Sequence, residues 1–143
     1  MNVKQISDFL ENKPGYLFSV TKVLAEHDID MRAFSLAESS DFGIARLIVD
    51  DVLATATVLK DAGFVCSLTP VLAVSVPDVP GGLSQVLELL SADEINVEYM
   101  YAFLGGKTGK AYMIFRVADT ARAAASLTAS GIRLVEQDEL SEL

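Results

Sequence analysis

Two stretches of the chain share one order of apolar and polar positions, and each predicts strand, helix, strand, strand, helix and strand. Period-two alternation predicts strands, and apolar residues spaced by three and four predict helices. In the first stretch the expected elements are 3–10, a helix from Pro14, 30–38, 42–50, 52–63 and 64–71. In the second they are 72–78, 80–94, 96–104, 110–118, 119–131 and 132–137.

The two stretches are copies of each other. A shift of 66 residues pairs Pro14 with Pro80, Gly15 with Gly81, Leu17 with Leu83, Val20 with Val86 and Leu24 with Leu90. Beyond the hairpin of the second copy the shift becomes 68, pairing Leu59 with Leu127 and Gly63 with Gly131. Two copies are too few for a solenoid. We therefore expect a tandem duplication with repeats at 1–70 and 71–143.

The order βαββαβ is the ferredoxin-like motif, an α+β fold with an antiparallel sheet and both helices on one face. A repeat of about 70 residues buries little surface alone. Thr69–Val71 leaves almost no linker, so we expect the copies to be tightly coupled, in one larger sheet or face to face. The apolar strands favour a covered sheet face and a homodimer.

Composition narrows the possible functions. The chain has 143 residues, is 51% hydrophobic and carries a formal charge of −9, which argues against nucleic acid and against an anionic membrane surface. One cysteine and one histidine provide no disulfide framework and no evident metal site. We expect no cofactor. The N-terminal stretch lacks signal-peptide features, and no apolar run is long enough to span a membrane, so cytoplasmic residence is expected.

Other residues that suggest chemistry have ordinary structural interpretations. His27 is expected on the surface at a helix end, and the acidic pairs at 50–51 and 93–94 are expected to cap or solvate helix ends. The stretch LGGKTGK lacks the first glycine of a phosphate loop, because Tyr101 stands there, and is predicted to be a hairpin. Tyr99, Tyr101 and Phe103 share one strand face and are expected to pack in a core or an interface.

The two Pro-Gly turns remain. Pro14 and Pro80 suit the first turn of a helix, and the short polar residues before them, Asn12 and Asp78, suit capping. The unpaired N–H groups of a first turn also suit a carboxylate, and the polar residues beside them suit an ammonium. Together these groups match an α-amino acid, although their chemistry alone favours ordinary helix capping.

The sequence N-x-P-G-x-L, an apolar helix and then I-D-M or I-N-V resembles the ACT domain, at residues 12–31 and again at 78–97. The resemblance covers the whole chain and implies a small, non-catalytic regulatory protein that binds an amino acid between ACT domains. It implies ligand contacts from two loops and two strand starts: Asn12, Lys13, Pro14, Gly15, Tyr16, Leu17, Asp30, Asp78, Val79, Pro80, Gly81, Gly82, Leu83 and Asn96.

In this interpretation Asn12 faces Asn96 and Asp78 faces Asp30 across the interface. The neutral asparagine pair is the favoured amino-acid site, because the two carboxylates of the other pair repel each other. Gly82 in place of Tyr16 is expected to give the second loop more room. An enzyme of amino-acid metabolism is the expected partner. The alternative is an interaction module that acts on a partner enzyme without a small ligand. Catalysis by this chain itself is disfavoured, because the sequence lacks acid–base groups.

Overall fold

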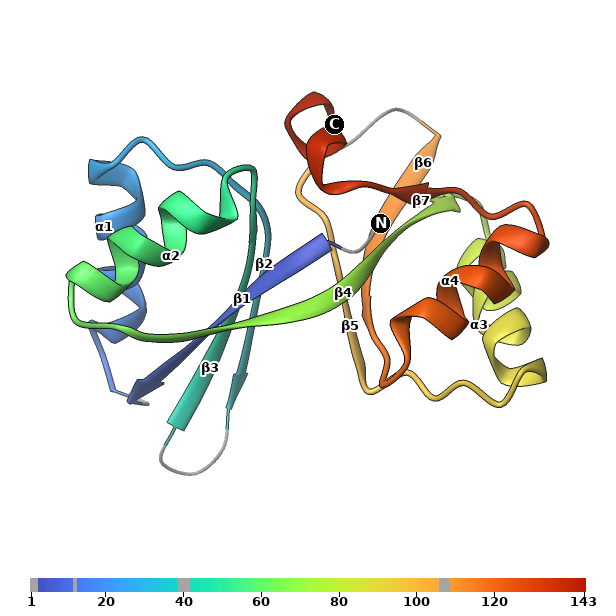
Figure 1. The fold of residues 1–143 in the computed structure, drawn as a ribbon, viewed down its shortest axis with the longest axis horizontal. Helices are drawn as coiled ribbons and strands as arrows, with labels where there is room; N and C mark the ends of the chain where they lie inside the picture. Colours follow the sequence, from blue (N-terminus) through green and yellow to red (C-terminus); the bar gives the residue numbers. More distant parts are fainter. Residues whose placement is uncertain (1–2, 12, 39–41, 106–108) are drawn as a thin grey trace. The chain divides into compact units, whose positions relative to one another are not determined.

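A computed structural model describes residues 3–11, 13–38, 42–105 and 109–143. These residues form two compact units: Lys4–Thr69, called here the first repeat, and Pro70–Leu143 with Val3, called the second repeat. Each unit carries two helices on one face of its strands (Figure 1). No described helix has both the length and the apolar character needed to cross a membrane.

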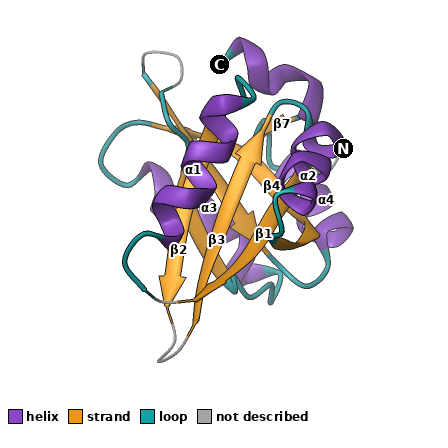
Figure 2. Ribbon diagram, turned by 90° about the vertical axis from the view of Figure 1, so that its left-hand side faces the viewer, coloured by secondary structure: helices purple, strands orange, loops and turns teal. Residues whose placement is uncertain are grey.

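The first repeat has the ferredoxin-like strand order β2-β3-β1-β4. Its strands β1 and β2 pair antiparallel with the central β3 (Figure 2). Its elements are β1 (Val3–Glu11), α1 (Tyr16–Glu26), β2 (Met31–Glu38), β3 (Phe42–Val49), α2 (Val52–Asp61) and the first part of β4 (Val65–Pro77). Val20, Leu24 and Leu59 are almost fully buried in its core, between helices and sheet.

The second repeat has the equivalent strand order, β5-β6-β4-β7. The later part of β4 is its first strand and lies between β6 and β7. Its other elements are α3 (Gly82–Ala92), β5 (Tyr99–Ala102), β6 (Lys110–Arg116), α4 (Thr120–Ala129), β7 (Leu134–Val135) and a 3-10 helix, η1 (Gln137–Glu142). Val86, Leu90 and Leu127 occupy its core at the positions that the repeat predicts. The predicted α+β fold with two βαββαβ repeats is confirmed.

Capping follows the same duplication. α1 and α3 differ by the predicted 66 residues, and α2 and α4 by 68. The second helix of each repeat is capped by an aspartate: the Ala54 N–H donates to Asp51 at 3.1 Å, and the Arg122 N–H donates to Asp119 at 3.0 Å. The capping role predicted for the 50–51 pair is thereby confirmed at Asp51.

The predicted starts of α1 and α3 are wrong. The helices begin at Tyr16 and Gly82 rather than at the prolines, and their N-caps are Gly15 and Gly81 without any side-chain cap. The Tyr16 N–H donates to the Lys13 carbonyl at 3.4 Å, and Gly15 has φ 93° and ψ −19°. These values are those of a type II turn, which places proline at its second and glycine at its third position.

Asp78 therefore does not cap α3; its own N–H donates to the Gly109 carbonyl at 3.2 Å. Asn12, the other expected cap, lies outside the described residues. A tight turn between strand and helix leaves no position for a side-chain cap, because the glycine itself takes the N-cap position.

Three further boundaries differ from the expectation. β4 is one continuous strand, although two strands meeting near residue 71 were expected; Pro70 is compatible with extended backbone. β5 covers only Tyr99–Ala102 of the expected 96–104. The 3-10 helix η1 was not predicted, because its 137–142 segment is mainly polar and Leu140 is its one buried residue.

The second loop has less room than expected, not more. A Cβ at Gly82 would lie 2.0 Å from the Pro77 carbonyl oxygen. The start of α3 is thus packed directly against the end of β4, and Gly82 is buried. The side chain is missing because backbone occupies its place.

Candidate functional site

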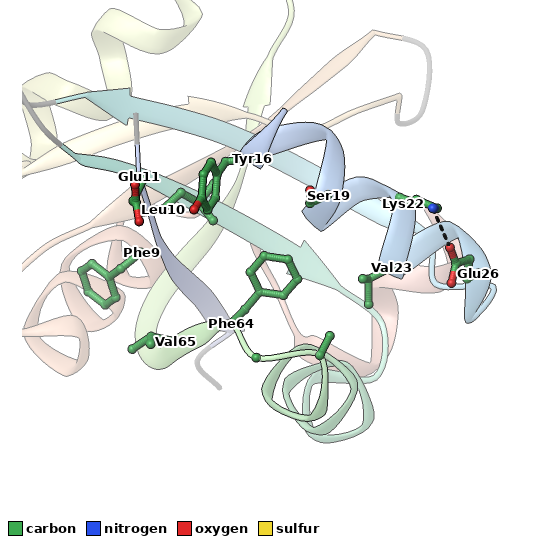
Figure 3. A pocket seen from close by; sticks show the side chains of 12 residues that line it. Phe9, Leu10, Glu11, Tyr16, Ser19, Lys22, Val23, Glu26, Phe64 and Val65 are labelled. Atoms are coloured by element: carbon green, nitrogen blue, oxygen red, sulfur yellow. Dashed lines mark ion pairs between the residues drawn. The ribbon is translucent and has the colours of Figure 1, made fainter. Parts of the chain in front are cut away.

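An open groove of about 770 Å³ lies beside α1 in the first repeat, next to the Pro-Gly turn. One wall is the helix itself, and the others are the end of β1 and the segment that joins α2 to β4. Figure 3 shows Phe64 between the α1 wall and the pair Phe9 and Val65. The lining residues are Phe9, Leu10, Glu11, Tyr16, Ser19, Lys22, Val23, Glu26, Ala62, Gly63, Phe64 and Val65.

The rim beside the turn carries opposite charges. Lys13 Nζ lies 2.8 Å from Glu11 Oε2, and both side chains are largely exposed. The hydrogen bond and the charge of Lys13 hold the pKa of Glu11 below its usual value, with a smaller contribution from the Tyr16 hydroxyl. Glu11 in turn raises the pKa of Lys13. Both groups are therefore charged at neutral pH.

The predicted loop residues of the first repeat fall into two groups. Tyr16 lines the groove and is 37% exposed, whereas Leu17 packs against the core. Lys13, Pro14 and Gly15 are exposed in the turn. The groove and the turn lie side by side, so a ligand held at the turn has an adjacent place for its side chain.

The corresponding turn of the second repeat has a different character. Asp78, Val79, Pro80 and Gly81 are exposed, and Leu83 packs against the core. Gly82 is closed off by the Pro77 carbonyl, as described above. The two turns share their backbone form but present different side chains.

Asp30 and Asn96 lie at the opposite end of their own sheets from the turns. Asp30 precedes Met31, which pairs with Val49 at the end of β3, whereas the first turn follows Glu11, which pairs with Phe42 at the start of β3. Within one repeat the structure therefore does not bring the strand-start residues to the turn. Their pairing across repeats stays a prediction.

Each of these two residues lines a small cleft beside the start of the second helix of its repeat. Asp30 forms an ion pair of 2.9 Å with Arg32, and its cleft of about 150 Å³ also contains Asp28, Asp50 and Asp51. Asn96 is exposed in a cleft of about 240 Å³. The first cleft is thus rich in carboxylates.

A buried polar pair lies under the helices of the first repeat. Asp8 is fully buried, and neither of its carboxylate oxygens has a hydrogen-bond partner among the described residues that meets ordinary geometry. Burial raises the pKa of Asp8 to about 6, and the neighbouring Cys66 thiol, a weak donor, lowers it only in part. Burial and the adjacent Asp8 raise the pKa of Cys66 to about 12.

We predict that Cys66 reacts slowly with thiol reagents. At pH 8 a thiol with a pKa of about 12 has a thiolate fraction roughly 1000-fold below that of an ordinary cysteine, and the greater nucleophilicity of its thiolate offsets part of this. Cys66 should react with a disulfide reagent roughly 50-fold more slowly than a free thiol does. The rate is followed by absorbance. Asp8→Asn should accelerate it, and a rate equal to that of glutathione would contradict the assignment.

Several other sequence predictions are settled by the structure. His27 is exposed at the end of α1, where its Nδ1 lies 2.9 Å from the Val23 carbonyl, as expected for a surface residue. Tyr101 and Phe103 are buried, and Phe103 contacts the Tyr112 ring with centroids 6.3 Å apart. Packing is thus confirmed for both. The residues 106–108 of LGGKTGK lie outside the described residues.

Sequence reasoning missed the groove and most of its lining. Glu11 immediately precedes the predicted loop, and Phe64 immediately follows the glycine that ends α2. Adjacency to the turn was a signal for Glu11. No sequence pattern marked Phe64, because only the fold brings the end of α2 next to α1.

Comparison with known proteins agrees with this architecture. A family model described as an ACT domain pair matches residues 1–143. The structure of protein BT0572 from Bacteroides thetaiotaomicron is 38% identical, with a TM-score of 0.92, covering 100% of this chain and 98% of that one. The ligand-free regulatory subunit of aspartate kinase from Thermus thermophilus is 18% identical, with a TM-score of 0.69 and 92% of each chain covered. Curated proteins yielded no match.

The fold and its paired turns define a class of protein, a tandem of two ferredoxin-like repeats with a Pro-Gly turn before the first helix of each. The match over the whole chain is more specific: this protein belongs to the ACT domain pair family, as the sequence resemblance predicted. The likeness to the aspartate kinase subunit, at 18% identity, concerns the fold alone.

Proposed function

We propose that this chain is a non-catalytic regulatory protein that binds a free α-amino acid at its ACT repeats. The observation that carries the proposal is the Pro-Gly turn of the first repeat, which lies beside an open groove and a pair of opposite charges. The ligand carboxylate would approach the first turn of α1, whose N–H groups lack helical partners. Family membership and the aspartate kinase regulatory subunit of the same fold support a regulatory role.

The proposal keeps two non-equivalent sites. Asn12 with Asn96 is the favoured site, and Asp78 with Asp30 the second; each pair would join the repeats or two chains. A homodimer, cytoplasmic residence and a partner enzyme of amino-acid metabolism belong to the same proposal. Ligand binding would shift the packing only as far as the ligand prefers one arrangement.

Isothermal titration against the twenty amino acids tests this function directly. We expect one or a few to bind with a dissociation constant below 1 mM, which corresponds to about 4 kcal/mol of binding free energy. If none of them binds in this range, the chain is not a sensor of free amino acids.

A sharper prediction concerns Asn96, the strand-start residue that the proposal pairs with the turn of the first repeat. Asn96→Ala should weaken binding by about tenfold, because the side-chain amide would lose a hydrogen bond to a charged ligand group. Asp61→Ala is the matched control, since Asp61 lies at the exposed end of α2 and belongs to neither pair. Equal affinities of wild type, Asn96→Ala and Asp61→Ala would remove Asn96 from the site.

The alternative function is an interaction module that contacts a partner enzyme without a small ligand. It is favoured by large apolar side chains on the surface of the first repeat: Phe18, Leu53 and Val65 are 67%, 73% and 68% exposed. Gel filtration with and without amino acids separates the two functions. The interaction module predicts an elution volume that no amino acid changes.

A further inference from the structure

The groove of the first repeat is lined by aromatic rings. Phe9, Tyr16 and Phe64 come from three different elements or junctions and all line the groove. Figure 3 shows the Tyr16 and Phe64 rings on the α1 side of β1, and the Phe9 ring on the other side of this strand. Phe9 is 48% exposed and Tyr16 is 37% exposed, so a ligand can reach their rings. Rings prefer edge-to-face or offset contacts with other rings, and such contacts add affinity beyond the burial of area. The lining therefore favours an aromatic side chain over an aliphatic one of equal size.

The rim of the groove complements the backbone end of a free amino acid. Glu11 and Lys13 place a carboxylate and an ammonium 2.8 Å apart, and an α-amino acid carries the opposite two groups on one carbon. Exposed ion pairs contribute little stability, so a ligand can exchange partners with this pair at small cost. A peptide terminus would offer only one of the two charges.

We propose that the groove of the first repeat receives the side chain of an aromatic α-amino acid, whose ammonium pairs with Glu11 and whose carboxylate pairs with Lys13. This inference rests on the proposed function and names its ligand class. Leu10, 4% exposed, belongs to the apolar lining of the groove.

The second repeat lacks the charges and the rings of this arrangement. The equivalent positions carry different residues. The first repeat has Glu11, Lys13, Tyr16 and Phe64, and the second has, in the same order, Pro77, Val79, Gly82 and Ile132. Neither charge and none of the three rings is present, since Ser75 stands in place of Phe9. The position of the Tyr16 side chain is taken by the Pro77 carbonyl. Of the two Pro-Gly turns in the described part of the chain, therefore, only the first has a site for an aromatic amino acid beside it.

Titration calorimetry on the full chain with phenylalanine, tyrosine, tryptophan, histidine, leucine and aspartate tests the inference. We expect an aromatic amino acid to bind about three- to tenfold more tightly than leucine, with one ligand per chain.

Glu11→Gln should weaken binding about tenfold. Glu88→Gln, on the exposed surface of α3, is the matched control and should leave affinity unchanged. Phe64→Leu should reduce the preference for rings, because Tyr16 remains. Leucine is similar in size to Ile132, the residue at the equivalent position of the second repeat.

The outcomes separate the two proposals. If leucine or aspartate binds best, if two ligands bind per chain, or if Glu11→Gln binds as wild type does, the aromatic site is wrong while the amino-acid sensor stands. If none of the twenty amino acids binds, the proposed function itself fails. Preferential aromatic binding that Glu11→Gln weakens and Glu88→Gln does not would establish the site.

Discussion

Gly82→Ala is expected to lower the free energy of unfolding by roughly 2–4 kcal/mol, because a core packed to native density cannot absorb an added carbon at this point. The new Cβ would lie 2.0 Å from the Pro77 carbonyl oxygen and 3.1 Å from its carbon, and both are backbone atoms. Relief requires moving the start of α3 away from the end of β4. Urea unfolding followed by circular dichroism measures the change.

Gly43→Ala is the matched control for this prediction. Its Cβ would meet Leu36 Cδ1 at 3.4 Å and the Ala37 oxygen at 3.8 Å, which are ordinary contacts. We expect a change within about 1 kcal/mol, since an alanine in a strand also restricts the unfolded chain. Equal losses in the two variants would show that Gly82 does not mark a close approach of backbone.

Asp8→Asn is expected to stabilise the protein at pH 7 by up to roughly 3 kcal/mol and to have little effect at pH 4. The pKa of Asp8 is raised from 3.8 to about 6 in the folded state, chiefly by burial. A raised pKa means that the folded state binds the proton of Asp8 more tightly than the unfolded state does. The stability that this proton contributes is fully present below pH 3.8 and is lost as the pH rises through about 6. Above that pH a buried carboxylate is ionised without an adequate partner, and asparagine removes that charge.

The measurement is the difference in unfolding free energy between variant and wild type, from urea titrations at pH values between 4 and 8. Asp61→Asn, at the exposed end of α2, is the control for removal of an exposed carboxylate and should give a small difference. The assignment fails if the difference for Asp8→Asn is flat across this range. A flat curve would mean that solvent reaches the carboxylate.

Local pattern was sufficient for most of the fold. The apolar spacing of α1 and α3 and the aspartate cap of α2 are local features, and both reappear in the structure. The 66-residue shift is found by comparing two such local patterns, and it also reappears. The errors fall where two local signals compete. Proline suits a first helical turn and also a type II turn, and the glycine after it, at φ 93°, favours the turn.

The candidate site was predictable only in part. The loop at Lys13–Tyr16 was identified from its turn chemistry and from the resemblance to the ACT domain, and the structure places it beside the groove. Phe9 and Phe64 were not identified, since 55 positions separate them in the chain. Only the β2-β3-β1-β4 order brings the end of β1 next to the start of β4.

The sequence by itself determined the duplicated βαββαβ order, the buried helix faces and the two Pro-Gly turns, because turn preference and apolar periodicity act between neighbours in the chain. Tertiary structure decided what each turn can hold. Beside α1 it opens a groove lined by rings and by Glu11, which forms an ion pair with Lys13 of the turn. Beside α3 it brings the Pro77 carbonyl against Gly82. This distinction depends on how closely a helix start approaches a strand end, a distance that no local pattern encodes.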